Sequence, residues 1–410
     1  MEARQRRKAP SRARVSRRNG SRRWCVPPAL LHEPDELLEG AGVLDELPTQ
    51  VGLVLWQSLR DVTLWASVEP EARAELFEPD AARARLGALL ASGAEPALEV
   101  SLTTLAALVG SPETANPEIV GLVCIQVSRW AEERGAFAAA MGFAQTAAQV
   151  VPLDASPALA AGALALRWRR SARAETWLRR TVGLARRRRQ WEAYAQAYVE
   201  LGGLYLRRGQ GGLAHRFFVQ GLRAARRHGL IAVRGAALHG LLNLAVEAGS
   251  LDDAERYARG AMRAYGRGHP RLPELVHDVA YLWVRRESYA RAIPMLQKLL
   301  PTRVEPVERA LTLAILARAA AGAGDERLHQ ESWMDAWAVI NRRPNEAGKH
   351  ARALLELARA SVLVRDWNHV EQAVRLASAA VSPQAERAVA TQVEELAAAI
   401  KARKSLVPGA

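Results

Sequence analysis

Small residues recur along this chain about every 34–40 residues, in pairs whose members stand twelve positions apart. The third pair is Gly202 and Ala214, with Tyr205 and Phe218 close by. A small side chain lets two packed helices approach closely, and neighbouring aromatic rings fill the space beside the crossing. A period of this length is typical of stacked helix pairs, so each repeat is interpreted as one unit made of a helix A and a helix B.

Seven such units can be followed from Pro117 onward. Gly135, Gly209, Gly249 and Gly324 mark turns between helix A and helix B, and Pro or Gly residues separate most units from the next. The predicted crossing positions on helices A and B of units one to seven are Ser128/Ala140, Gly162/Ala174, Gly202/Ala214, Leu242/Ala254, Ala280/Ala292, Ala317/His329 and Ala358/Val370.

The composition favours helices throughout. Nearly half of the chain is apolar, and Ala and Leu, which are strong helix formers, supply most of that share. Val and Ile are spread thinly and show no alternation of the kind that predicts strands. The predicted fold class is therefore all-α, a solenoid of stacked antiparallel helix pairs.

The cysteine content and the apolar runs exclude several classes of protein. Two cysteines without a Cys/His cluster predict neither a disulfide framework nor a metal site, and Cys124 is expected to be a buried, inert thiol on the apolar face of a helix. No apolar run approaches the ~18 residues that span a bilayer. The basic start is followed by Trp24-Cys25-Val26-Pro27-Pro28 rather than by an apolar leader. We therefore expect a cytoplasmic protein without membrane insertion.

The third unit resembles the tetratricopeptide repeat. The resemblance implies a right-handed superhelix over residues 117–382, with about seven units whose A helices line a concave groove that binds peptides or protein segments. Intervals near 40 residues exceed the family's usual length, so armadillo-like or HEAT-like pairs stay open as the subtype. The residues that carry the resemblance are Tyr198, Leu201, Gly202, Tyr205, Gly209, Ala214 and Phe218.

The segments outside the repeats have a different character. Residues 1–28 are expected to be a disordered basic arm, and residues 29–110 an acidic, irregular helical region that acts as a degenerate repeat or cap. Within that region we predict helices over 49–67, 69–92 and 95–110. Residues 383–403 are predicted to form a capping helix and residues 404–410 a disordered tail.

No catalytic signature is present in the sequence. Walker loops, a Gly-rich dinucleotide fingerprint, a metalloprotease helix motif and a nucleophile elbow are all missing. Because stacked Ala-rich helices offer few convergent polar groups, we expect a non-catalytic scaffold or adaptor with no cofactor.

The predicted groove holds a small set of polar candidates. His239 and Asn243 are spaced i,i+4 on helix A of the fourth unit, and His277 and Tyr281 have the same spacing in the fifth. At the ~10 Å separation of packed helices, the two pairs are too far apart to share a metal but suited to hydrogen-bonding an extended peptide. Arg318 follows along the same surface, with Arg352 and Arg359 beyond it. The alternative is that all of these are ordinary solvated helix residues.

Charge is distributed unevenly along the chain. Residues 1–23 hold ten Lys or Arg against one acidic residue, residues 24–110 hold fourteen acidic residues against four Arg, and residues 167–227 hold sixteen Arg against three Glu. The arginines of this last segment are expected on or just after helix B, as a basic patch. The sequence leaves three ligands open for this patch: a nucleic acid, an acidic partner protein and the acidic region of the same chain. The fourth alternative is that these arginines are ordinary solvated residues. The residues of this patch are Arg179, Arg180, Arg186, Arg187, Arg188, Arg189, Arg223, Arg226 and Arg227.

Overall fold

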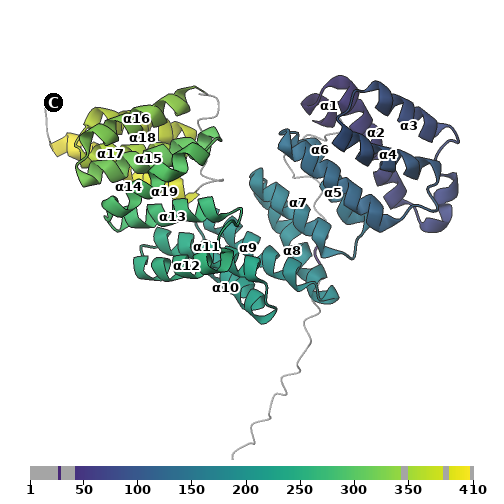
Figure 1. Ribbon diagram of the computed structural model, residues 1–410, viewed down its shortest axis with the longest axis horizontal. Helices are drawn as coiled ribbons and strands as arrows, with labels where there is room; N and C mark the ends of the chain where they lie inside the picture. Colours follow the sequence, from purple (N-terminus) through teal and green to yellow (C-terminus); the bar gives the residue numbers. More distant parts are fainter. Residues whose placement is uncertain (1–25, 29–41, 343–349, 382–386, 407–410) are drawn as a thin grey trace, which may run out of the picture.

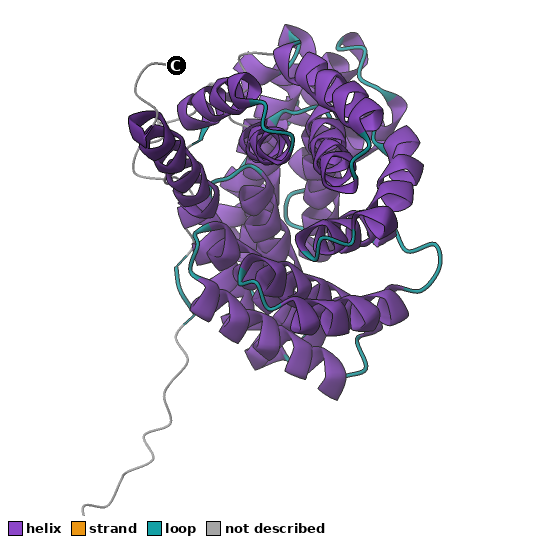
Figure 2. Cartoon of the chain, turned by 90° about the vertical axis from the view of Figure 1, so that its left-hand side faces the viewer, coloured by secondary structure: helices purple, strands orange, loops and turns teal. Residues whose placement is uncertain are grey.

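A computed structural model describes residues 26–28, 42–342, 350–381 and 387–406 of the chain. Within these residues every regular element is helical, and Figures 1 and 2 show helices joined by loops, which confirms the all-α class. Seven helix pairs follow one another, and in each pair the two helices pack against each other. The pairs are α5 (Pro117–Glu133) with α6 (Phe137–Val150), α7 (Ala155–Arg167) with α8 (Ser171–Arg188), α9 (Trp191–Arg207) with α10 (Gly211–Arg227), α11 (Ile231–Glu247) with α12 (Leu251–Tyr265), α13 (Leu272–Arg285) with α14 (Tyr289–Leu299), α15 (Pro306–Ala323) with α16 (Glu326–Asn341), and α17 (Ala351–Leu363) with α18 (Trp367–Ala380).

The turn between helices A and B has the same backbone conformation in all seven units. The predicted turn glycines Gly135, Gly209, Gly249 and Gly324 all have positive φ, between 69° and 77°. In units two, five and seven the same place is held by Arg169, Glu287 and Arg365, with φ of 58° to 61°. A left-handed residue costs little for glycine and more for other residues, so the geometry of the turn is fixed by the helix packing and not only by the glycines.

The residues at the predicted crossings bring the paired helices into direct contact. The Ser128 hydroxyl donates to the carbonyl of Ala140 at 2.7 Å, and the His329 ring lies 3.0 Å from the carbonyl of Ala317. In the third unit the ring of Phe218 takes this place. A Cβ atom on Gly202 of α9 would lie 2.5 Å from Phe218 Cδ1, and one on Gly240 of α11 would come closer still to the same ring. Phe218 is thus held between two glycines on neighbouring A helices.

The N-terminal helices pack against the first unit. α1 (Gly42–Glu46) and α2 (Thr49–Ser67) lie against α6, and α4 (Pro96–Gly110) lies against α5. The predicted single helix over 69–92 is wrong, because the chain forms the short 3-10 helix η1 (Pro70–Glu75) and then α3 (Ala81–Ala91). Pro79 explains the break, since the residue before a proline is driven out of the helical conformation.

The C-terminal units have a hydrophobic core that is separate from the main one. One cluster of buried apolar residues runs from the N-terminal helices to α15, and a second spans α15 to α19 (Arg387–Leu406). α15 contributes to both, through Ile315 and Leu316 to the first and through Leu313 and Ala317 to the second. The 3-10 helix η2 (Leu300–Thr302) precedes it. α19 packs on α17 and α18 at the end of the stack, and its helical backbone continues to Leu406, past the predicted end at residue 403.

Two further expectations concern burial and membranes. Cys124 is fully buried, and burial raises the pKa of its thiol to about 12, which keeps it in the unreactive protonated form. Among the described helices none combines the length and the apolar character that a bilayer crossing requires. Residues 1–25 of the basic arm predicted over 1–28, and residues 407–410 of the predicted tail, lie outside the described residues.

Candidate functional site

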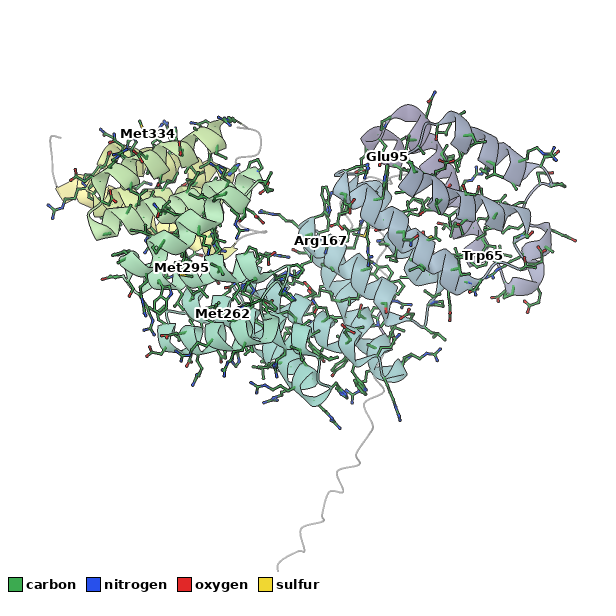
Figure 3. All side chains as sticks on the ribbon, viewed as in Figure 1. Trp65, Glu95, Arg167, Met262, Met295 and Met334 are labelled. Atoms are coloured by element: carbon green, nitrogen blue, oxygen red, sulfur yellow. The ribbon has the colours of Figure 1, made fainter. Side chains whose placement is uncertain are left out.

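The A helices line a groove on the concave side of the solenoid. A cavity of about 660 Å³ is lined by residues from α7, α9, α11, α13, α17 and α19 and by Phe218 of α10. A second cavity of about 250 Å³ opens between α11, α13, α15 and α17. Seven residues line both cavities, so the two form one continuous groove. Figure 1 shows that the stack of helix pairs curves around this space. Figure 3 places Arg167 where the N-terminal half of the stack faces the C-terminal half. The seven shared residues are His239, Asn243, Arg271, Glu274, Tyr281, Arg352 and Glu356.

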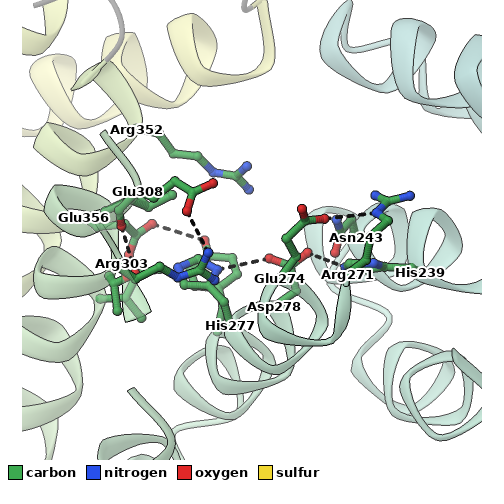
Figure 4. Close-up of a pocket in the computed structure, with 14 residues that line it drawn as sticks. His239, Asn243, Arg271, Glu274, His277, Asp278, Arg303, Glu308, Arg352 and Glu356 are labelled. Carbon is green, nitrogen blue, oxygen red and sulfur yellow. Dashed lines mark hydrogen bonds and ion pairs between the residues drawn. The ribbon is translucent and has the colours of Figure 1, made fainter. Parts of the chain in front are cut away.

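The floor of the smaller cavity contains two histidines joined by one carboxylate (Figure 4). His239 Nε2 lies 2.7 Å from Asp278 Oδ2, and His277 Nδ1 lies 3.2 Å from Asp278 Oδ1. Burial acts to raise the pKa of Asp278, but hydrogen bonds from the two histidines outweigh it and hold that pKa well below its usual range. Asp278 is therefore an ionised acceptor that fixes both imidazole rings.

This arrangement corrects the predicted role of His239. Its side chain is buried, with 3% of its surface exposed, and its second ring nitrogen lies 3.5 Å from the Tyr265 hydroxyl. Both ring nitrogens thus face partners within the chain, so His239 is neither a solvated residue nor a donor open to a peptide. His239 and His277 lie on the neighbouring A helices α11 and α13, and both contact the same carboxylate. Among the described residues no group of three or more His, Cys, Asp or Glu side chains is arranged to hold a metal ion.

A buried glutamate organises the other side of the groove. Glu356 of α17 has 1% of its surface exposed and accepts ion pairs from Arg318 and Arg359, both at 2.7 Å. The hydroxyl of Tyr281 on α13 also donates to it, at 3.1 Å. Burial acts to raise the pKa of Glu356, but the charges of the two arginines outweigh it and lower the pKa. Tyr281 and Arg318, both predicted to face a ligand, are bound to this internal acceptor.

The groove also has polar groups that the chain leaves open to a ligand. The Asn243 side chain lines both cavities, and it makes no hydrogen bond to another described residue. Arg285 lines the larger cavity, and no ion pair joins it to a described acidic residue. The side chain of Arg352 is 49% exposed, and its nearest acid is Glu247 at 3.7 Å. These three side chains provide one amide and two guanidinium groups on the groove surface.

The pKa of Glu247 predicts how stability should change with pH. Burial raises this pKa above its ordinary value, and the charges of Arg352 and Arg285 only partly oppose the shift. A carboxyl group whose pKa is higher in the folded state stabilises the fold when protonated, and this contribution is lost as the pH rises from the unfolded pKa of about 4.3 through the folded pKa. We therefore expect Glu247→Gln to unfold at a higher urea concentration than the native chain at neutral pH, and the difference to shrink toward acid pH. A less stable variant at neutral pH would mean that the ion pair to Arg352 outweighs the cost of burial.

Sequence reasoning missed the acidic members of the groove. The predicted residues His239, Asn243, His277 and Tyr281 all line the smaller cavity, whereas Arg318 reaches the groove only through its ion pair to Glu356. No signal in the sequence pairs Asp278 with His239, which stands 39 positions earlier. Two features together could have identified Glu356. It falls on the buried stripe of α17, and a single acidic residue on a buried stripe needs a basic partner.

The arginines of the predicted basic patch differ in their contacts and exposure. Arg179 donates to Glu175 at 2.8 Å and to the hydroxyl of Tyr205 at 3.0 Å, and Arg180 donates to the carbonyl of Pro27. The described acidic helices do not cover this patch, since α1, α2 and α4 pack on α5 and α6, and α3 packs on α2 and α4. The other predicted arginines are exposed at the C-terminal ends of α8 and α10, and they are Arg186, Arg187, Arg188, Arg189, Arg223, Arg226 and Arg227.

Comparison with known proteins identifies the fold. No protein-family profile matches the chain, and no curated protein sequence matches it. A Rap protein solved in complex with competence and sporulation factor is 10% identical, with 85% of this chain and 100% of that chain covered and a TM-score of 0.51. Yeast Tom70 is 11% identical, with 88% and 75% covered and a TM-score of 0.39, and BtubC from P. vanneervenii is 17% identical, with 56% and 93% covered and a TM-score of 0.41. With its seven stacked helix pairs, the chain has the fold of a tetratricopeptide-like helical repeat protein.

Proposed function

We propose that this protein is a scaffold that binds an extended segment of a protein or peptide in its concave groove. The observation that carries the proposal is the continuous groove along the A helices, in which Asn243 lies at the junction of the two cavities without a partner among the described residues. The larger cavity alone, at about 660 Å³, falls in the range of ligand-binding clefts. The Rap protein of similar fold was solved with competence and sporulation factor bound, which supports a ligand-binding role for this architecture.

The accessible charges of the groove favour an acidic ligand. Asp278 and Glu356 already accept hydrogen bonds or ion pairs from partners within the chain, and burial raises the pKa of Glu247. Arg285 forms no ion pair with a described acidic residue, and Arg352 has only a long one, to Glu247 at 3.7 Å. A guanidinium group binds a carboxylate through two parallel hydrogen bonds, so a ligand side chain of Asp or Glu would fit here.

Asn243 is suited to hold the ligand's backbone. A side-chain amide offers both donors and an acceptor, so it can pair with the N–H and C=O groups of an extended chain. Position 243 on α11 also faces both cavities, which places the amide in the path of any segment that runs through the groove. We assign Asn243 to backbone binding, and Arg285 and Arg352 to recognition of acidic side chains.

The experiment is a selection from a random peptide-display library with the full-length protein, followed by fluorescence anisotropy on the enriched peptides. We expect the enriched peptides to contain Asp or Glu, and Asn243→Ala to weaken their binding by at least about tenfold, equivalent to ~1.4 kcal/mol. Arg285→Gln should weaken acidic peptides more than variants of the same peptides in which the acids are replaced by amides.

The matched control is Gln220→Ala, which removes an exposed amide from helix B of the third unit. It should leave the affinity unchanged, and circular dichroism should show the same helix content for all variants. If substitution of Asn243, Arg285 and Arg352 leaves the affinity for the enriched peptides unchanged, the groove is not their binding site. A selection that enriches no acidic peptide would contradict the assigned charge preference.

A further inference from the structure

The imidazole ring of His277 leaves one polar atom open in the smaller cavity (Figure 4). Its Nδ1 atom lies 3.2 Å from Asp278 Oδ1, and the other oxygen of that carboxylate lies 2.7 Å from His239 Nε2. An ionised carboxylate only accepts hydrogen bonds, so each ring carries its proton on the nitrogen that faces Asp278. In a neutral imidazole the second nitrogen then has a free lone pair. His277 Nε2 is therefore a hydrogen-bond acceptor.

This acceptor has no partner among the residues that the structure describes. The His277 ring bonds Asp278 through Nδ1 alone, and Nε2 is not one of the fully buried polar atoms that lack a partner. The side chain is 12% exposed, and it lines the smaller cavity but not the larger one. A ligand that fills the cavity displaces the water at Nε2, and an acceptor left without a partner then costs free energy. The site therefore favours a ligand group that donates a hydrogen bond here.

The charged side chains around this acceptor are already paired with one another. Arg271 donates to Glu274 at 3.0 Å, and Arg303 donates to Glu308 at 2.7 Å. The two carboxylates of the floor have partners within the chain, as described above. A charged ligand group would have to displace one of these pairs or stay unpaired in a partly buried space, which is costly. The donor that fits beside His277 is therefore a neutral group.

Helix α15 supplies an apolar wall to the same cavity. Leu311 and Ile315 stand one turn apart on α15, and both line the smaller cavity but not the larger one. Thr312 stands between them, and its hydroxyl is occupied because it donates to the carbonyl of Glu308 at 2.8 Å. The volume of about 250 Å³ is far larger than a water molecule needs. The cavity thus suits a ring that packs on apolar side chains and carries a neutral donor at its tip, which describes the phenol of tyrosine.

We propose that the smaller cavity binds a tyrosine side chain of the peptide ligand, with the phenol hydroxyl donating to His277 Nε2. The inference rests on the proposed peptide-binding function and adds to it the side chain that fixes the register of the ligand. Asn243 lies at the junction of the two cavities, so the ring enters beside the backbone that Asn243 holds. Arg285 lines only the larger cavity, so the tyrosine and the acidic residue that Arg285 binds occupy different cavities.

The experiment uses synthetic copies of the peptides that the full-length protein enriches from the random library. We expect a Tyr at one recurrent position of these peptides. Replacing that Tyr by Phe should weaken binding by about 3- to 10-fold, the effect of one neutral hydrogen bond, as measured by fluorescence anisotropy. Glu at the same position should bind more weakly than Phe, because a carboxylate cannot donate to Nε2.

Two substitutions of His277 separate the roles of its two nitrogens. In His277→Asn the side-chain amide can still donate to Asp278, but nothing replaces Nε2, so the Tyr and Phe peptides should bind equally well. In His277→Gln the longer side chain can bring an amide oxygen to about the position of Nε2, so part of the preference for Tyr should return. Circular dichroism should show the same helix content for both variants and the native chain.

The outcomes distinguish this inference from the peptide-binding proposal on which it rests. Enriched peptides that depend on Asn243 but share no recurrent Tyr would overturn the inference and leave peptide binding in the groove intact. A preference for Tyr over Phe that persists in His277→Asn would also overturn it. A recurrent Asp or Glu whose binding requires His277 would show that the ring donates, contrary to the proposed acceptor. Peptides that bind equally well after substitution of Asn243 and of His277 would overturn both proposals.

Discussion

Replacing Glu356 by Gln is expected to lower the free energy of unfolding by about 3–5 kcal/mol, because Arg318 and Arg359 would lose the carboxylate that neutralises them. The Arg318 side chain is only 17% exposed, so water can restore little of the lost interaction. In the native chain the Tyr281 hydroxyl donates to the charged Glu356 carboxylate at 3.1 Å. In the variant its acceptor would be the neutral amide of Gln, which forms a weaker hydrogen bond. Urea denaturation followed by circular dichroism measures the change.

The control for this prediction is Glu394→Gln, which removes an exposed glutamate from α19 and should change stability by less than about 0.5 kcal/mol. A second comparison tests the proposed cause. Arg318→Met should lower the free energy of unfolding much less in the Glu356→Gln variant than in the native chain. In that variant the charge of Arg318 has already lost the carboxylate that neutralises it. Additive losses from the two substitutions would show that Glu356 and Arg318 stabilise the fold independently.

Replacing Phe218 by Ala is expected to lower the free energy of unfolding by about 3–5 kcal/mol. This is the range for removal of a large aromatic side chain from a packed core. Phe218 is 2% exposed, and its ring fills the space between Gly202 of α9 and Gly240 of α11. The substitution would leave a cavity where the third and fourth units meet, which in a stacked solenoid is the contact that couples the units. We expect the urea midpoint to fall and the transition to broaden as the two parts of the chain unfold less cooperatively.

Two adjacent glycines provide the matched test of this packing. Gly202→Ala places a methyl group 2.5 Å from Phe218 Cδ1, and such overpacking should cost about 1–3 kcal/mol. Gly203→Ala meets nothing within 4 Å, and the higher helix propensity of alanine should stabilise α9 by up to ~1 kcal/mol. The same substitution is thus expected to have opposite signs at neighbouring positions. Equal effects at 202 and 203 would contradict the contact between Gly202 and Phe218.

The architecture could be predicted from sequence because it depends on short-range pattern. The crossing residues of a unit stand twelve positions apart, and the turn between its helices is a local backbone conformation. Gly135, Gly209, Gly249 and Gly324 could therefore be recognised as turns. Arg169, Glu287 and Arg365 occupy the same turn in other units without any sequence signal, because helix packing imposes the left-handed conformation there.

The chemistry of the groove could not be predicted in the same way. His239 and Asn243 belong to one helix face, and that much follows from their spacing. The partner of His239 is Asp278 on the next A helix, 39 positions away, and Tyr281 bonds Glu356 at a distance of 75 positions. The second contact joins the fifth and seventh units, past the sixth. Nearest-neighbour stacking does not predict it, since it depends on how tightly the superhelix curves.

The charge distribution, too, could be predicted only in part from the sequence. Composition alone located an arginine-rich segment and a basic arm, and it left open three ligands for the segment, with ordinary solvated arginines as the fourth alternative. In the structure Pro27 is anchored on Arg180 of α8, and the acidic helices α1, α2 and α4 pack on α5 and α6 instead. The sequence by itself determined the repeat, the helices and their pairing, because these follow from local spacing and side-chain size. Only the tertiary structure decided which buried charges are neutralised and which surfaces stay open to a ligand, because those contacts join residues far apart in the chain through the curvature of the stack.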